Sequence, residues 1–391
     1  AAMRALVLIS DRPWPPITGS RVRNAHLWPA VRRLGVEVRL LGLDQGAPPA
    51  GSGGGGEPVE LHPFDRDPYP LRVWAALRHS YHEWPRSGSL ARRVSDLVEE
   101  WSPDVVHAEE LRMAAYLPEP RRAARPPSHT VTLHNVESDL SRQTGSSASR
   151  LGRAWIEAMH LRSLLRFERR ALHRADLAFA YSMVDLARYR KLYPAVRWAA
   201  TRSGINASEI APAPQPAEPS VLLLGSLSYA PNVRGLLWFL DRVLPLLPSE
   251  WRVTVAGSHA TQEVRRRLAG TRVRFVDTPE SLGPLYREHA VSAVPLFQGS
   301  GTRGKILEAL GHERMVVSTT LGAEGLDLAE GEGVVLADDA EGFASEIRRW
   351  AGAPRERAEL ARRGREAVLR KYDWPGVAAD LVAAWTACVS D

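Results

Sequence analysis

The residues best suited to chemistry stand in a glycine-rich segment near residue 300. Residues 297–310 read FQGSGTRGKILEAL, in which a glycine-rich turn after an apolar strand leads into a helix that begins near Thr302. Free backbone N–H groups at the start of a helix, together with its dipole, favour binding of phosphate. Arg303 and Lys305 can add positive charge, and the carboxylate of Glu308, one turn further along, can hold a ribose hydroxyl. The segment indicates a site for a phosphorylated ribose, although an ordinary capped helix with solvated charges fits the same pattern.

A second polar turn ends a strand at residues 316–325, which read VVSTTLGAEG. In an open parallel sheet such turns lie together at the carboxyl edge, where ligands bind. Elsewhere, residues 51–56 (GSGGGG) precede a strand rather than a helix, and we interpret them as a surface loop. His107, Glu109 and Glu110 end another strand and could contact a substrate, although a buried structural histidine fits equally well.

The composition excludes several classes of protein. The chain has 391 residues, 44% hydrophobic and 25% charged, which is typical of a folded protein long enough for two domains. No apolar run approaches the roughly 18 residues that span a bilayer. A single cysteine, Cys388, allows no internal disulfide, and we expect no metal site. The first residues lack the pattern of a signal peptide, so we expect a cytoplasmic enzyme.

The positive charge is concentrated in the first half of the chain. The formal net charge is +6, and of 51 basic residues only Lys191, Lys305 and Lys371 are lysines. Four arginines within residues 162–170 recur at helical spacing and share one face of a long predicted helix. Such a face favours at most weak peripheral contact with an anionic membrane. The charge also suggests a nucleic-acid-binding protein without catalysis, but no recognition motif accompanies it, and we expect no nucleic-acid partner.

Strands and helices alternate along nearly the whole chain, the pattern of an α/β protein with parallel sheets. The proline- and alanine-rich residues 211–219 interrupt this pattern at mid-chain and are predicted to be a linker. The expected domains are therefore 1–210 and 220–374, with the last helix, 375–391, packing back onto the first domain.

Several segments together resemble one family. GSGTRGKILEAL followed by VVSTTLGAEGL resembles the nucleotide-sugar half of GT-B glycosyltransferases of family 4, a retaining group that builds polysaccharides, glycolipids and antibiotics. PWPPITGSRVRNAHLW resembles the first loop and helix of that family, and VTLHNVESDLSR resembles the strand and turn that carry its active-site histidine. The resemblance extends almost from end to end of the chain.

The resemblance implies two Rossmann-like domains that face each other across a cleft, with the donor bound to the second and the acceptor to the first. A hexosyl-type transferase (EC 2.4) would use a nucleoside diphosphate sugar as co-substrate, with no cofactor and no metal. The implied catalytic residues are His134, Arg303 and Lys305. The implied donor-binding residues are Gly19, Gly225, Asp277, Thr278, Gly299, Ser300, Gly301, Thr302, Glu308, Gly322, Ala323 and Glu324. The implied acceptor residues are Glu109, Asn135 and Glu137.

The sequence departs from the family pattern at a few positions. Ser300 stands where the family has the first of two glutamates, of which Glu308 is the second. The loop 226–232 lacks the usual arginine and lysine, and residues 313–315 (ERM) replace a Gly-x-Pro turn. Because the first glutamate is missing, a nucleotide-sugar epimerase or a pseudo-glycosyltransferase on the same fold are alternatives to sugar transfer with retention. The donor base and sugar, the acceptor and the oligomeric state are left open.

Overall fold

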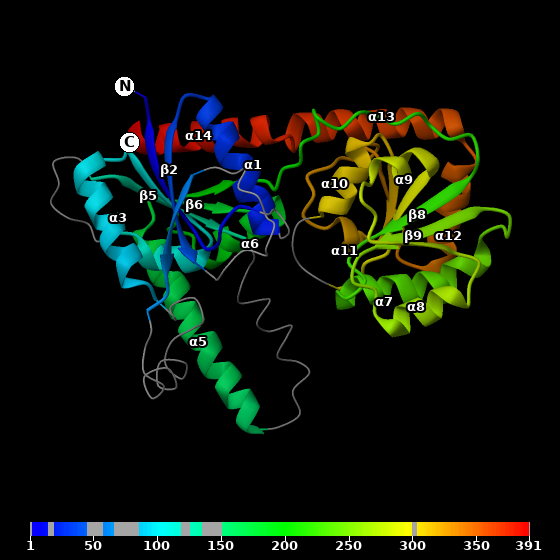
Figure 1. Cartoon of the computed structure of the whole chain (residues 1–391), viewed down its shortest axis with the longest axis horizontal. Coiled ribbons are helices and arrows are strands. Elements are labelled where there is room, and N and C mark those ends of the chain that lie inside the picture. Colours follow the sequence, from blue (N-terminus) through cyan, green and yellow to red (C-terminus); the bar gives the residue numbers. More distant parts are fainter. Residues whose placement is uncertain are drawn as a thin grey trace. The chain divides into compact units, whose positions relative to one another are not determined.

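The computed structural model describes residues 2–14, 19–44, 58–65, 86–118, 126–134, 151–298 and 303–390, with the backbone alone for 151–160. The chain divides into two compact units: unit 1 comprises Ala1–Gly204 and Trp374–Asp391, and unit 2 comprises Ile205–Asp373. Each unit contains one parallel sheet covered by helices (Figure 1). The expected class, two α/β units with the last helix returning to the first, is confirmed.

The described strands of unit 1 form a seven-stranded parallel sheet in the order β3-β2-β1-β4-β5-β6-β7. They are β1 (Arg4–Ile9), β2 (Glu37–Asp44), β3 (Val59–Pro63), β4 (Val105–Glu109), β5 (Ser128–Leu133), β6 (Leu177–Ala180) and β7 (Trp198–Ala200). The chain runs outward from β1 to β3 and then returns to β4 on the other side of β1. The carboxyl ends of β1 and β4 therefore form the switch point at which open parallel sheets bind ligands.

Helices cover both faces of this sheet. On one face α1 (Gly19–Arg33) packs against α14 (Trp374–Ser390), and the Trp28 and Trp385 rings stack 6.3 Å apart. On the other face lie α3 (Gly88–Trp101), the short 3-10 helix η1 (Leu111–Tyr116), α5 (Leu151–Arg174) and α6 (Met183–Leu192). In α3 the apolar residues recur every three or four positions, so they bury one face against the sheet.

The described strands of unit 2 form a six-stranded parallel sheet in the order β10-β9-β8-β11-β12-β13, with its switch point between β8 and β11. The strands are β8 (Ser220–Leu224), β9 (Arg252–Gly257), β10 (Arg274–Asp277), β11 (Val291–Val294), β12 (Met315–Ser318) and β13 (Val334–Leu336). The helices are α7 (Ala230–Trp238), α8 (Gln262–Ala269), α9 (Gly283–Glu288), α10 (Gly304–Gly311), α11 (Thr320–Ala323), α12 (Ala340–Ala351) and α13 (Pro354–Lys371), and α7 continues into the short helical turns η2 (Phe239–Val243) and η3 (Leu244–Leu246).

The segment expected to be a free linker, residues 211–219, is part of unit 2 instead. The guanidinium of Arg314 donates to the carbonyl oxygens of Ala213 (3.0 Å) and Pro214, and Arg357 donates to that of Pro216 (2.6 Å). Proline has no backbone N–H to donate but keeps its carbonyl acceptor. Buried arginines can therefore hold a proline-rich segment in place although it forms no secondary structure. The boundaries consequently lie at 204/205 and 373/374 rather than at the predicted positions.

The arginine-rich helix is α5. Its apolar residues Leu164, Phe167 and Leu172 are buried in the core of unit 1, and all four arginines within residues 162–170 are exposed. Within the described part of the chain, no helix combines the length and the apolar character needed to cross a membrane.

The turn after α10 predicts a stabilising substitution. Glu313 follows the C-cap of this helix with φ of 59°, a left-handed conformation that strains a residue with a Cβ. Replacing Glu313 by glycine should therefore raise the free energy of unfolding by about 1 kcal/mol. Glu366→Gly, an exposed position inside α13, should lower it by about 1 kcal/mol. Urea unfolding of the full chain measures both, and a destabilised Glu313→Gly protein would contradict the assigned strain.

Candidate active site

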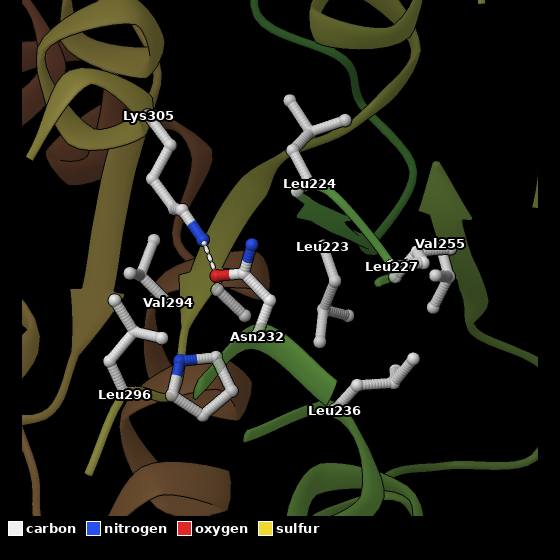
Figure 2. Close-up of a pocket in the computed structure, with 12 residues that line it drawn as sticks. Leu223, Leu224, Leu227, Asn232, Leu236, Val255, Val294, Leu296 and Lys305 are labelled. Carbon is white, nitrogen blue, oxygen red and sulfur yellow. Dashed lines mark hydrogen bonds between the residues drawn. The ribbon is translucent and has the colours of Figure 1, made fainter. Parts of the chain in front are cut away.

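A cavity lies at the switch point of unit 2. It is lined by Leu223, Leu224, Gly225, Leu227, Asn232, Leu236, Val255, Ala293, Val294, Pro295, Leu296 and Lys305. Figure 2 shows its apolar wall, built by the ends of β8, β9 and β11. The amide of Asn232 and the ammonium of Lys305 are its polar groups. A mostly apolar hollow with a few converging polar groups is typical of a ligand site.

Lys305 is the cation of this cavity. Its Nζ donates to Oδ1 of Asn232 (2.7 Å), as Figure 2 shows, and Nδ2 of Asn232 donates to the carbonyl of Ser226 (3.0 Å). Burial, together with the charge of Arg303, lowers the pKa of Lys305 to about 8. In the described part of unit 2 no carboxylate pairs with this ammonium. A desolvated cation with a single neutral partner is suited to binding an anion.

Gly225 leaves room for this arrangement. It follows β8, and a Cβ at this position would lie 2.8 Å from Nδ2 of Asn232 and 3.3 Å from Nζ of Lys305. Any larger residue would therefore push the amide and the ammonium apart. The amide of Asn232, in the first turn of α7, therefore holds a lysine from α10.

Arg303, the residue directly before α10, contacts the second polar turn predicted by the sequence. Its guanidinium donates to the carbonyls of Leu321 (2.9 Å) and Glu324 (3.3 Å). At Gly322, a Cβ would lie only 2.4 Å from Oγ of Ser318. Arg303 therefore fixes the turn that contains Gly322, Ala323 and Glu324, and it is largely buried in doing so.

Glu308 lies in α10, one turn beyond Lys305. Burial raises the pKa of its carboxyl group, and its side chain makes no hydrogen bond or ion pair with the described residues. The buried hydroxyl of Tyr286 also has no hydrogen-bond partner among the described residues, and Tyr286 contributes to the same core cluster as α10. A desolvated carboxylate without a partner can accept hydrogen bonds from the hydroxyls of a ligand.

The remaining predicted donor residues are less informative. Asp277 is the last residue of β10 and Thr278 follows it; both are exposed. Asp277 pairs with Arg265 (2.5 Å), and Thr278 has a positive φ of 46°. At Gly19, the first residue of α1, an added Cβ would contact nothing within 4 Å. Gly299, Ser300, Gly301, Thr302, Asn135 and Glu137 lie outside the described residues.

A charged cluster occupies the switch point of unit 1. Glu109, the last residue of β4, accepts from Nε of Arg23 (2.8 Å) and from Nε2 of His134 (2.6 Å) on one carboxylate oxygen, and its other oxygen lies 3.1 Å from Nε2 of His107. Burial opposes its ionisation, but the charge of Arg23 and the hydrogen bonds from both histidines outweigh burial and hold the pKa of Glu109 well below its usual value. Glu109 is therefore an anion inside the protein.

The predicted contact of Glu109 with an acceptor is not supported by this arrangement. The side chain of Glu109 has no exposed surface, because α1 places Arg23 against it and His134 covers its outer oxygen. From the sequence, alternation along the strand places His107 and Glu109 on the same face of the sheet, but it does not show which helices cover that face. His107 is fully buried as well, and burial lowers its pKa, so it is a neutral structural histidine.

Two family models match the chain. One, described as a glycosyl transferase 4-like domain, matches residues 18–204, and the other, described as glycosyl transferases group 1, matches residues 218–352. Together they cover most of both units. The chain belongs to the family-4-like GT-B glycosyltransferases.

Known proteins similar to this glycosyltransferase include one curated relative and several solved structures. An uncharacterized 44.6 kDa protein in the cps region of Klebsiella pneumoniae is 30% identical over 139 residues, which cover 33% of this chain and 36% of that protein. Sucrose-phosphate synthase from Thermosynechococcus elongatus has a TM-score of 0.68 at 16% identity, covering 99% of both chains. A glycosyltransferase from Rickettsia africae has a TM-score of 0.66 at 11% identity, covering 100% of both.

A further structure, that of HepE from Anabaena in complex with UDP and glucose, has a TM-score of 0.65 at 13% identity and covers 98% of this chain and 99% of that one. At these identities the solved structures establish the fold of the glycosyltransferase, two parallel α/β units, and not its substrates.

Sequence reasoning missed two residues of these sites. Asn232 places the ammonium of Lys305, and Arg23 neutralises Glu109. Asn232 is uncharged and belongs to no motif that the sequence indicated, and Arg23 is one of many arginines in the chain, so neither was predicted. A glycine at position 225 beside a long apolar strand was the only available signal for Asn232, since it indicates that another group approaches the backbone closely.

Proposed function

We propose that this glycosyltransferase moves a sugar from a nucleoside diphosphate sugar to an acceptor hydroxyl with retention of configuration. The observation that carries the proposal is the desolvated ammonium of Lys305, held by Asn232 beside Gly225 at the switch point of unit 2. HepE, which shares the fold, has been solved with UDP and glucose, and this supports a nucleotide-sugar donor. Polysaccharide, glycolipid or natural-product assembly in the cytoplasm is the setting we propose.

The diphosphate is the leaving group, and its developing charge is what the enzyme must stabilise. Lys305 would pair directly with the phosphates. Arg303, which is occupied by the carbonyls of Leu321 and Glu324, would hold the second turn in place and add its positive charge to the field. Glu308 would accept hydrogen bonds from the ribose. Lys305 and Arg303 together supply the positive charge that a metal ion supplies in other transferases, so we propose that this enzyme needs no metal ion.

Retention follows from attack on the face from which the diphosphate leaves. The bond between the anomeric carbon and the diphosphate oxygen breaks, and the bond to the acceptor oxygen forms on the same side of the sugar. The proton of the acceptor hydroxyl passes to an oxygen of the departing phosphate. His134 would orient the donor sugar by a hydrogen bond and take no proton. No protein nucleophile enters this scheme.

Thermal unfolding with UDP, GDP, dTDP and ADP tests the donor site. A nucleotide at 100 times its Kd stabilises the folded chain by about 2.7 kcal/mol, so one of the four should give a clear rise in Tm. Product analysis with the matching sugar nucleotide then decides the reaction. Free nucleoside diphosphate together with a glycoside supports transfer, whereas an isomerised sugar nucleotide would contradict it in favour of epimerisation. No shift with any nucleotide would contradict the donor site itself.

Lys305 gives nucleotide affinity a dependence on pH. Its lowered pKa of about 8 means that the free enzyme carries the charge at pH 7 and loses it above pH 8. A bound diphosphate favours the charged form, so affinity should fall as pH rises through 8, by up to about tenfold per pH unit. Calorimetric titration at pH 7, 8 and 9 with the nucleotide that gives the largest thermal shift measures this. The Lys305→Met enzyme, which lacks the titrating group, should bind more weakly at every pH and without this slope; parallel slopes in both proteins would exclude Lys305 as the cause.

A further inference from the structure

The charged cluster in unit 1 is built around one carboxylate. Glu109 and Arg23 are both fully buried, and both oxygens of Glu109 are used. The rest of the Arg23 guanidinium is also bonded, to the carbonyl of Arg202 (2.8 Å) and to Oγ1 of Thr201 (3.1 Å). The cluster therefore links α1, β4 and the segment after β7 through hydrogen bonds between buried groups.

Stability alone does not account for this pair. Removing a carboxylate and a guanidinium from water costs several kcal/mol for each ion, and well-packed apolar residues in place of such a pair often leave a protein as stable or more so. Of the three described side chains that bond Glu109, only His134 reaches the surface, with 16% of its side chain exposed. The buried pair of Arg23 and Glu109 thus bonds one partly exposed imidazole, that of His134.

The backbone directly after Glu109 is strained. Glu110 has a φ of 88°, which is unfavourable for a residue with a Cβ, and such strain is concentrated at functional sites. This turn brings Oε1 of Glu110 to 3.7 Å from Nδ1 of His134, on the opposite side of the ring from Glu109. The imidazole also packs on Tyr181, with ring centroids 4.3 Å apart. Two consecutive acidic residues therefore enclose one histidine, the first buried and the second partly exposed.

We propose that Glu109, held in place by Arg23, is a positioning residue for His134. It fixes the orientation of the imidazole and keeps a proton on Nε2, so that the Nδ1 edge beside Glu110 is the one presented to substrate. This rests on the proposed function, in which His134 contacts the donor sugar. The contact that carries it is the 2.6 Å hydrogen bond from Nε2 of His134 to the buried carboxylate.

Nitrogen NMR of the full chain tests the positioning without any substrate. With ¹⁵N-labelled histidine, and the His134 signals assigned by comparison with a His134→Ala protein, we expect the wild-type ring to carry its proton on Nε2. Glu109→Gln should shift the ring nitrogens toward a mixture of tautomers. Because that change leaves Arg23 buried without its counter-ion, the double variant Arg23→Met/Glu109→Leu provides a second protein without the anchor. Unchanged His134 signals in whichever variant folds would overturn the proposal.

Kinetics provide the second readout. With UDP-glucose as the probe and UDP release as the signal, Glu109→Gln should lower kcat by roughly 10- to 100-fold with little change in KM, by analogy with the loss seen when the partner that orients a metal-binding histidine is removed. In a His134→Ala background the same change should have no further effect. Thr130→Val, which removes the bond to Nδ1 of His107 at the far side of the cluster, is the matched control and should retain kcat.

The outcomes separate this proposal from the proposed function. Effects of Glu109→Gln and His134→Ala that multiply would show that Glu109 does not act through His134, and would overturn the positioning role. A His134→Ala enzyme with wild-type kcat would instead contradict the proposed contact of His134 with the donor. The NMR result decides the positioning in that case as well.

Discussion

Replacing Lys305 by methionine is expected to lower kcat by about 100- to 1000-fold, the loss typical of removing one group that stabilises a developing negative charge. Methionine has an unbranched side chain of similar length, so it should still fill the edge of the cavity that Lys305 lines together with Leu223 and Val294. The ammonium is already desolvated, and its loss leaves only the amide oxygen of Asn232 without a donor. We therefore expect the free energy of unfolding to change by no more than about 1 kcal/mol.

The chain offers a matched control in Lys191, an exposed lysine of α6 in unit 1. Lys191→Met should leave both turnover and stability unchanged. Turnover is measured as release of the nucleoside diphosphate from the donor that thermal unfolding selects. A Lys305→Met enzyme with wild-type kcat would show that the departing phosphate is stabilised elsewhere, and would remove the observation on which the proposed function rests.

Replacing Arg314 by methionine should give the largest loss of stability in unit 2, about 3 kcal/mol or more. This guanidinium is 1% exposed, and it forms no ion pair with a carboxylate among the described residues. It donates instead to carbonyl oxygens, among them those of Tyr286 (2.6 Å) and Ala213 (3.0 Å), and methionine would leave these buried acceptors unsatisfied. For a unit of this size the loss corresponds to a fall in Tm of roughly 6–12 °C.

Thermal unfolding of the full chain measures this loss, and limited proteolysis locates it. Because Arg314 holds the proline-rich residues 211–219 against unit 2, cleavage within that segment should become faster in the variant. Arg355→Met, at an exposed position in the first turn of α13, should change the unfolding free energy by less than about 0.5 kcal/mol. An unchanged Tm for Arg314→Met would mean that water replaces the guanidinium at those carbonyls.

The sequence was sufficient for the features that depend on local pattern. Continuous apolar runs such as RALVLI in β1 predicted buried parallel strands, and alternation with amphipathic helices predicted two α/β units. The segment before α10 and the turn at Gly322 were predicted to be neighbours, and Arg303, directly before α10, donates to the carbonyl of Leu321 in that turn. These features follow from the periodicity of the chain and from the rule that the carboxyl ends of parallel strands meet at one edge.

Features that depend on packing between distant segments were not predictable. Glu109 has the same sequence signature as an exposed carboxylate at a strand end, and only Arg23, 86 positions earlier, makes its burial tolerable. The proline-rich segment has the composition of a free linker, and its attachment depends on the distant side chains Arg314 and Arg357. Single-sequence patterns report which face a residue occupies, whereas these roles depend on what another part of the chain places against that face.

The placement of α14 has a consequence for synthesis. Trp374 and Trp385 are buried in the core of unit 1, yet they follow the entire sequence of unit 2. The two ends of unit 2 meet, since the N–H of Ile205 donates to the carbonyl of Tyr372 (2.8 Å), so this unit has all of its residues while α14 is still being translated. Domains generally fold in the order in which they leave the ribosome. In this chain, unit 2 can complete its fold before unit 1 does. Until α14 arrives, Trp28 and the apolar side of α1 have no cover, and that face is what a chaperone would meet on the nascent chain.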